Sequence, residues 1–115
     1  MKPAWFLLGA TSLLAVGFGS VAWAAQSSDA QAGDLERGQK LAKAWCASCH
    51  AVEPGAQPPF AGVPSFRDVA RLPSTTAASL HAFLATPHGG DMPAVKLNGD
   101  ELDAIVTYVL SLKQR

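Results

Sequence analysis

Two stretches of the chain repeat apolar residues at helical spacing, and they lie at opposite ends of its folded part. The first begins at Asp34, which is a good N-cap. Its apolar face consists of Leu35, Gly38, Leu41, Ala42 and Trp45. The second begins at Asn98, with Glu101 three residues later as in a capping box. Its stripe consists of Leu102, Ile105, Val106, Val109 and Leu110. The pattern predicts one helix at each end of the domain.

The middle of the chain predicts two shorter helices separated by loops. Prolines and glycines crowd residues 51–65 and exclude a regular helix or a central strand there. A short helix is expected from Phe66 to Ala70, before Pro73. Ser74 or Thr75 can cap a further helix that Pro87 stops. No stretch alternates apolar and polar residues as a strand does, so the predicted class is all-α.

The N-terminus reads as an export signal that is removed from the mature protein. Lys2 precedes an apolar run from Ala4 to Val21, and Ala22-Trp23-Ala24 places small residues where a signal peptidase cleaves. We therefore expect a signal peptide at 1–24, a flexible leader at 25–32 and one domain at 33–115. This predicts a periplasmic protein without stable membrane insertion. The alternative is an uncleaved membrane anchor, since the run is nearly long enough to span a bilayer.

The net charge of the chain argues against a nucleic acid as its partner. Lys2 is the only charged residue of segment 1–24, so its removal leaves eight basic and nine acidic side chains, a formal charge of −1. A nucleic-acid partner would need a basic field, and none is present. The remaining 91 residues can bury only a limited core, so a large apolar cofactor would supply part of the interior.

Both cysteines of the chain lie in Cys46-Ala47-Ser48-Cys49-His50. This Cys-x-x-Cys-His pattern indicates covalent attachment of one haem c, with the thiols added to its vinyl groups and His50 as an axial ligand. A thioredoxin-type site would need a βαβ context, and a structural disulfide would not account for the histidine. A zinc site would need two more ligands, for which His81 and His88 are the obvious donors.

The other face of the iron needs a second ligand, and Met92 is the strongest candidate. Once Met1 is lost with the signal, it is the only methionine, and it lies in a glycine- and proline-flanked turn rather than on a helical stripe. A thioether ligand favours ferrous iron and raises the reduction potential. The rivals are His88, four residues away, and His81, which we interpret as a partly buried structural histidine beside Leu80.

With these residues in place, the chain resembles a class I cytochrome c of the small bacterial periplasmic monohaem type, over residues 33–115. The resemblance implies that the first and last helices cross at close range, with Gly38 against Ile105 or Tyr108. It also implies that a proline carbonyl after the motif accepts the N–H of His50. Pro64 is the favoured residue for this role, and Pro59 is the alternative.

The resemblance implies a one-electron carrier rather than an enzyme, because His50 and Met92 would leave no vacancy at the iron. The protein would be a monomer, and its partners would be a dehydrogenase, an oxidase or a reductase. Alternatives are an electron-accepting subunit of a periplasmic dehydrogenase and a ligand-binding haem protein with a labile sixth site. Trp45 and Phe60 are candidates for the lining of the haem pocket, with ordinary core packing as the alternative. The lysines that could flank the haem edge are Lys40, Lys43, Lys96 and Lys113.

Overall fold

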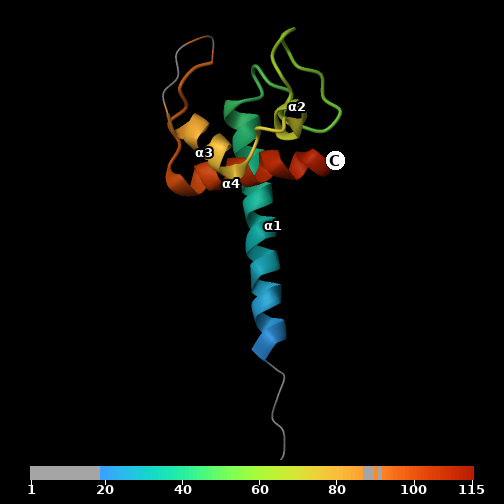
Figure 1. The fold of residues 1–115 in the computed structure, drawn as a ribbon, viewed down its shortest axis with the longest axis vertical. Coiled ribbons are helices and arrows are strands. Elements are labelled where there is room, and N and C mark those ends of the chain that lie inside the picture. The colour runs from blue at the N-terminus through green and yellow to red at the C-terminus, as the bar shows by residue number, and fades with distance from the viewer. Residues whose placement is uncertain (1–18, 87–89, 91) are drawn as a thin grey trace, which may run out of the picture.

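The described part of the chain is helical and contains no strand (Figure 1). A computed structural model describes residues 19–86, 90 and 92–115, and side chains from residue 28 onward. Its helices are α1 (Gly19–Trp45), α2 (Phe66–Arg71), α3 (Ala77–Ala85), α4 (Gly99–Ser111) and the 3₁₀ turn η1 (Leu112–Gln114). The predicted all-α class is therefore confirmed.

Helix α1 begins much earlier than the sequence predicts. It starts at Gly19, so Asp34 is an interior residue and not the N-cap, and residues 25–32 are helical in the full chain. The sequence between Val21 and Asp34 is rich in alanine and has no proline, so nothing in it stops a helix. Residues 28–34 are all exposed, and this part of α1 projects from the rest of the protein as a single rod (Figure 1). Cleavage after residue 24 remains a prediction.

The three shorter helices are defined by their caps. Asn98 caps α4 and exchanges hydrogen bonds with Glu101, which confirms the predicted capping box. Helix α2 has the same arrangement between Ser65 and Asp68. The prediction for α3 was wrong by one or two residues, because Thr76 is its N-cap rather than Ser74 or Thr75. Thr76 is the residue whose hydroxyl reaches the backbone N–H of Ser79, 3.1 Å away.

Helices α1 and α4 cross at Gly38. A Cβ atom placed on Gly38 would overlap the carbonyl of Ala104 and lie 2.7 Å from the Cβ of Tyr108. Of the two residues expected opposite this glycine, Tyr108 is the one found there, and Ala104 completes the contact. The crossing confirms the close approach of the first and last helices that the resemblance implies. It also fixes the end of α1, which leads directly into Cys46.

The core lies between α4 and the elements that surround it. Ile105 and Leu112 are its most deeply buried large side chains, at 2% and 1% exposure. The other members of the cluster are Ala42, Val52, Phe66, Ala70, Leu80, Leu102, Val106, Tyr108 and Val109. Helix α4 contributes more members of this set than any other element, as its apolar stripe predicts.

Tyr108 ties α4 to the segment that follows the Cys-x-x-Cys-His motif. Its hydroxyl donates a buried hydrogen bond of 2.7 Å to the carbonyl of Val52. We expect Tyr108→Phe to leave that carbonyl unpaired and to lower the free energy of unfolding by about 1–3 kcal/mol. Denaturant unfolding measures the loss. An equal loss in Thr107→Val, which removes a neighbouring hydroxyl on α4, would show that the Val52 contact is not the cause.

The pKa of Tyr108 predicts how the stability of the fold changes at alkaline pH. Burial, and to a lesser degree the nearby Glu53 carboxylate, raise the pKa of Tyr108. The folded protein therefore keeps the phenol proton to higher pH than the unfolded chain does. Its contribution to stability is complete below the ordinary tyrosine pKa of about 10 and is lost as pH rises through the higher folded value. Unfolding curves in that alkaline range should converge for the parent protein and Tyr108→Phe.

Candidate functional site

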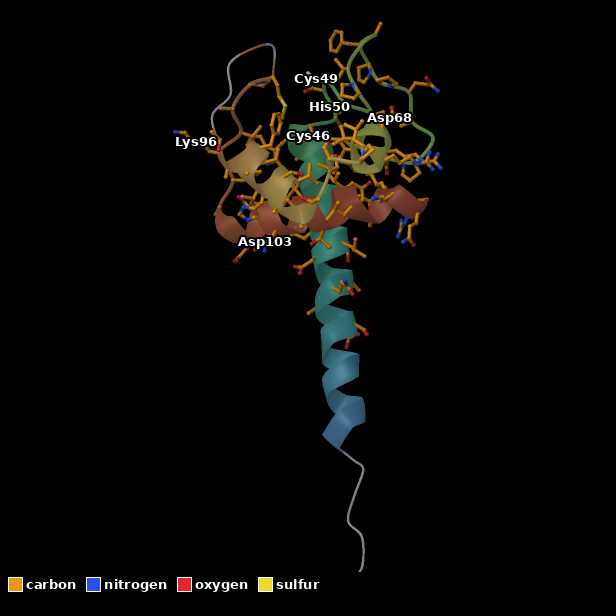
Figure 2. All side chains as sticks on the ribbon, viewed as in Figure 1. Cys46, Cys49, His50, Asp68, Lys96 and Asp103 are labelled. Carbon is orange, nitrogen blue, oxygen red and sulfur yellow. The ribbon has the colours of Figure 1, made fainter. Side chains whose placement is uncertain are left out.

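The Cys-x-x-Cys-His motif forms a turn that continues directly from α1. The backbone N–H of Cys46 still bonds to Ala42 at 2.9 Å, as in the helix. The N–H groups of Cys49 and His50 then both bond to the carbonyl of Cys46, at 3.1 and 2.9 Å. This turn closes the five residues on themselves, so both thiols and the imidazole lie at the same end of α1 (Figure 2).

These residues line a cavity of about 820 Å³. Cys46, Cys49, His50 and Met92 all contribute to its wall, although Met92 lies more than forty residues further along the chain. The remaining lining is largely apolar and comes from all four α-helices and from the loops between them. It includes Trp45 and Phe60, as expected, together with Phe66, Val69, Leu80, Phe83, Leu84, Leu97, Ile105 and Val109. The chain thus builds a large apolar chamber around two thiols and an imidazole.

The orientation of His50 is set by the loop that precedes α2. Its Nδ1 lies 2.7 Å from the carbonyl oxygen of Pro64. Because a carbonyl can only accept, Nδ1 carries the proton and donates, which leaves the lone pair on Nε2 for a metal. The contact is with Pro64 and not with Pro59, the alternative. The ring of Phe66 packs beside the imidazole, with ring centroids 5.5 Å apart.

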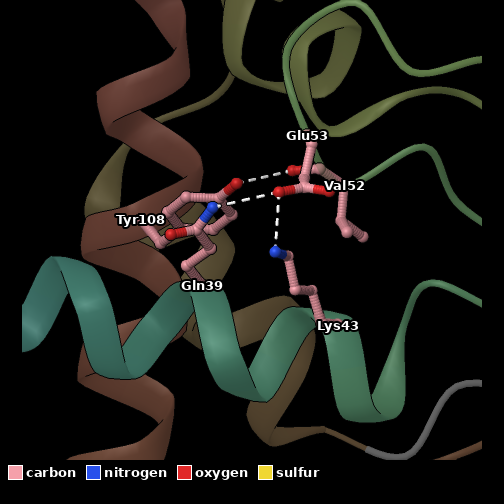
Figure 3. Close-up of polar contacts among 5 residues, drawn as sticks. All are labelled: Gln39, Lys43, Val52, Glu53 and Tyr108. Carbon is pink, nitrogen blue, oxygen red and sulfur yellow. Dashed lines mark hydrogen bonds and ion pairs between the residues drawn. The ribbon is translucent and has the colours of Figure 1, made fainter.

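Three contacts hold the segment after His50, and Figure 3 shows the two that involve Val52 and Glu53. The carbonyl of Ala51 accepts the N–H of Phe66 at 3.0 Å, and Val52 receives the Tyr108 hydroxyl. Glu53 pairs with Lys43 of α1 at 2.8 Å. Sequence reasoning missed these contacts, since each joins residues far apart in the chain. They keep the backbone around His50 fixed, so its ring has little freedom to turn.

The Glu53 carboxylate accepts hydrogen bonds from two side chains of α1. Lys43 donates to Glu53 Oε1, and Gln39 Nε2 donates to the same oxygen at 3.2 Å. The hydrogen bond from Lys43 is the main reason that the pKa of Glu53 lies below its ordinary value. In the same way, the bond to Glu53 raises the pKa of Lys43. This exposed pair anchors the loop and contributes little to stability by itself.

The thiols suit addition to vinyl groups. Cys46 and Cys49 are free cysteines, each partly buried. Burial raises the pKa of Cys46, and the charge on Cys49 adds to that rise. The Cys46 thiol therefore keeps its S–H bond near neutral pH. Sulfur and hydrogen of such a thiol both add across a vinyl double bond when a thioether forms, so nothing is lost in the attachment.

Other residues considered for the site lie elsewhere. His81 is exposed and its Nε2 is 3.0 Å from Asp103 Oδ1, which links α3 to α4 outside the cavity lining. The contact fits a structural role for His81, but the expectation that this histidine is partly buried was wrong, because its side chain lies on the exposed side of α3. His88 lies outside the described residues. None of the four lysines expected near a haem edge belongs to the cavity lining, and two are paired, Lys40 with Glu36 at 2.7 Å and Lys43 with Glu53.

Comparison with known proteins identifies the group that this chamber holds. The Cytochrome c family model matches residues 35–113. The chain belongs to the cytochrome c family. It is also 44% identical over 93 residues to "Cytochrome c-552" of Bradyrhizobium diazoefficiens, an alignment that covers 81% of this chain and 88% of that protein. No solved structure gives a significant match.

Membership of the family gives the cofactor, which is covalent haem c. The described residues fit it in three respects. Cys46 and Cys49 both line the cavity and are separated by two residues, His50 lines it with Nδ1 taken up by Pro64, and the apolar lining suits a flat apolar ring. The family also supports electron carriage with redox partners as the function of this cytochrome c. Among the described residues, no helix is long and apolar enough to cross a membrane.

Proposed function

We propose that this chain is an exported one-electron carrier in which His50 and Met92 bind the two faces of the haem iron. The observation that supports it best is that Met92 lines the same cavity as Cys46, Cys49 and His50. Met92 is only partly buried and lies in a loop, so no helical packing role accounts for it. When bound, the haem supplies an iron that exchanges one electron between its ferrous and ferric states.

The residues of the chain set the conditions for that exchange. Pro64 accepts the Nδ1 proton of His50, which holds the ring in one orientation and makes Nε2 a better donor. The thioether of Met92 favours the ferrous state and raises the potential. The apolar lining excludes water from the iron. With both axial positions taken by side chains, no vacancy is left for a substrate, which supports a carrier rather than an enzyme.

The proposal includes export and a redox protein as partner. Residues 1–24 have the composition of a signal peptide, and the small residues at 22 and 24 suit cleavage before Ala25. The mature chain would then act in the periplasm, as a monomer that meets a dehydrogenase, oxidase or reductase through a small transient interface. N-terminal sequencing of the exported protein tests the cleavage site, and an intact Met1 would contradict it.

Met92→Ala tests the ligand assignment. We expect the sulfur-to-iron charge-transfer band of the oxidised protein to disappear and carbon monoxide to bind the reduced protein stoichiometrically. The midpoint potential should fall by on the order of 0.1 V, a fraction of the roughly 0.8 V that axial ligands span. Visible spectra of both redox states and a potentiometric titration measure all three effects.

Val95→Ala is the matched control, because Val95 lines the cavity in the same loop and has no ligand atom. It should keep the band and exclude carbon monoxide. A Met92→Ala protein with the parent spectrum would remove Met92 from the iron. A parent protein that lacks the band and binds carbon monoxide readily would instead favour a ligand-binding haem protein, so the two failures are distinguishable.

A further inference from the structure

Few polar residues line the cavity, and three of them lie close together in the sequence. Among the described lining residues there is no lysine, arginine, aspartate or glutamate. Hydroxyl groups come from Ser48, between the two cysteines, and from Ser74, Thr75 and Ser79. The last three belong to the segment that leads into α3 and to its first turn. Ser74, Thr75 and Ser79 therefore form a cluster of hydroxyl groups that is far from the two cysteines in sequence.

Within this cluster, only Thr75 and Ser74 have hydroxyls that the local structure does not use. The Ser79 hydroxyl accepts the N–H of Thr76 at 2.9 Å and donates to the carbonyl of Ser74 at 2.9 Å. Thr75 is 9% exposed, and its backbone N–H bonds to Leu72 at 3.0 Å. Its hydroxyl forms no hydrogen bond with any residue that the structure describes. The hydroxyl is not one of the enclosed polar atoms that lack a partner, so it is open to the cavity that Thr75 lines and can donate to an acceptor held there.

Haem c brings two groups that need such donors. Its propionate carboxylates lie on the edge of the ring away from the vinyl groups, and Cys46 and Cys49 fix the vinyl edge. An ionised carboxylate only accepts hydrogen bonds. The described lining contains no lysine or arginine, and its hydroxyl groups can donate to such a carboxylate. Trp45 also has an N–H, but it is adjacent to Cys46 at the vinyl end and is 58% exposed.

We propose that the Thr75 hydroxyl donates a hydrogen bond to one haem propionate. Thr75 directly precedes Thr76, the N-cap of the nine-residue helix α3, so the positive end of that helix faces the same region. The proposal rests on the covalent haem of the proposed carrier and adds the residue that receives its carboxylate edge. The donor offsets the negative charge of the propionate near the iron, and so disfavours the ferric state relative to a protein without it.

Resonance Raman spectra of the reduced holoprotein test this assignment, because the propionate bending mode responds to hydrogen bonding. Thr75→Val keeps the shape of the side chain and removes the hydroxyl. We expect the mode to move to lower frequency and the midpoint potential at fixed pH to become more negative. Thr75→Ser should restore both. Thr107→Val, on α4 and outside the described cavity lining, is the control for loss of any threonine hydroxyl and should change neither.

Each outcome bears on the proposal. A shifted mode in Thr75→Val that returns in Thr75→Ser supports it. An unshifted mode and potential in Thr75→Val would overturn it, as would equal shifts in Thr75→Val and Thr107→Val. If Thr75→Val does not accumulate, the comparison of Thr75→Ala with Thr75→Ser decides in the same way. A parent protein whose spectrum lacks haem c would contradict the proposed function instead, before any threonine is changed.

Discussion

Cys46→Ala combined with Cys49→Ala is expected to yield a protein with no covalently attached haem. Each thiol supplies the sulfur of one thioether, and the chain has no other cysteine to replace them. Haem should then extract completely into acidified acetone, and the mass of the purified protein should equal that of the polypeptide alone. Mass spectrometry of the intact protein measures this directly.

The same double variant should also lose much of its ordered structure. The domain has a small core, and a cavity of about 820 Å³ lined by apolar side chains stands inside it. Without a retained ring, those side chains face water, so the melting temperature and the helical signal should both fall. Ala44→Ser is the control, since Ala44 is an exposed residue of α1 two positions before Cys46. Covalent haem retained in the double variant would contradict the attachment site.

Attachment could be predicted from sequence because it depends on neighbours in the chain. Cys46, Cys49 and His50 fall within a single turn, and the order of residues in this five-residue stretch is enough to recognise the attachment site. The same holds for the α4 cap, where Asn98 and Glu101 are three residues apart. Local chemistry of this kind is encoded within a few positions and needs no knowledge of tertiary structure.

Contacts between distant segments could not be predicted in the same way. Pro64 was favoured over Pro59 only through a family resemblance, and the 2.7 Å contact with His50 depends on how the loop folds back. The hydrogen bond from Tyr108 to Val52 joins residues 56 positions apart, and no pattern in either stretch of sequence predicts it. The start of α1 was missed for another reason. Asp34 has the side chain of an N-cap, but a cap forms only where the preceding residues leave the helix.

Gly38→Ala is expected to destabilise the protein more than any other single methyl group added to α1. The new Cβ would overlap the backbone carbonyl of Ala104, and a backbone atom cannot turn aside as a flexible side chain can. The helices must therefore separate. Overpacking of a core costs about 1–3 kcal/mol, and a collision with backbone places Gly38→Ala at about 3 kcal/mol. For a domain of this size that lowers the melting temperature by roughly 12 °C or more.

Gly33→Ala is the matched control, because it makes the same change one and a half turns earlier on the same helix. A Cβ on Gly33 meets no atom within 4 Å beyond its own neighbours in the helix. Alanine also favours helix over glycine by about 0.5–1 kcal/mol, so this variant should be at least as stable as the parent. Equal melting temperatures for Gly38→Ala and Gly33→Ala would show that the crossing of α1 and α4 tolerates a side chain.

The effect of Gly38→Ala should extend to the haem site through the two helices that it separates. Helix α1 ends at the turn with Cys46, while Ile105 and Val109 of α4 form part of the cavity wall. Tyr108 of α4 also holds the carbonyl of Val52, two residues after His50. Displacement of α4 therefore loosens the segment that fixes the proximal ligand. We expect a weaker sulfur-to-iron band and faster binding of carbon monoxide in Gly38→Ala, with neither change in Gly33→Ala. A destabilised Gly38→Ala protein with the parent spectrum would show that the crossing stabilises the fold without positioning the iron ligands.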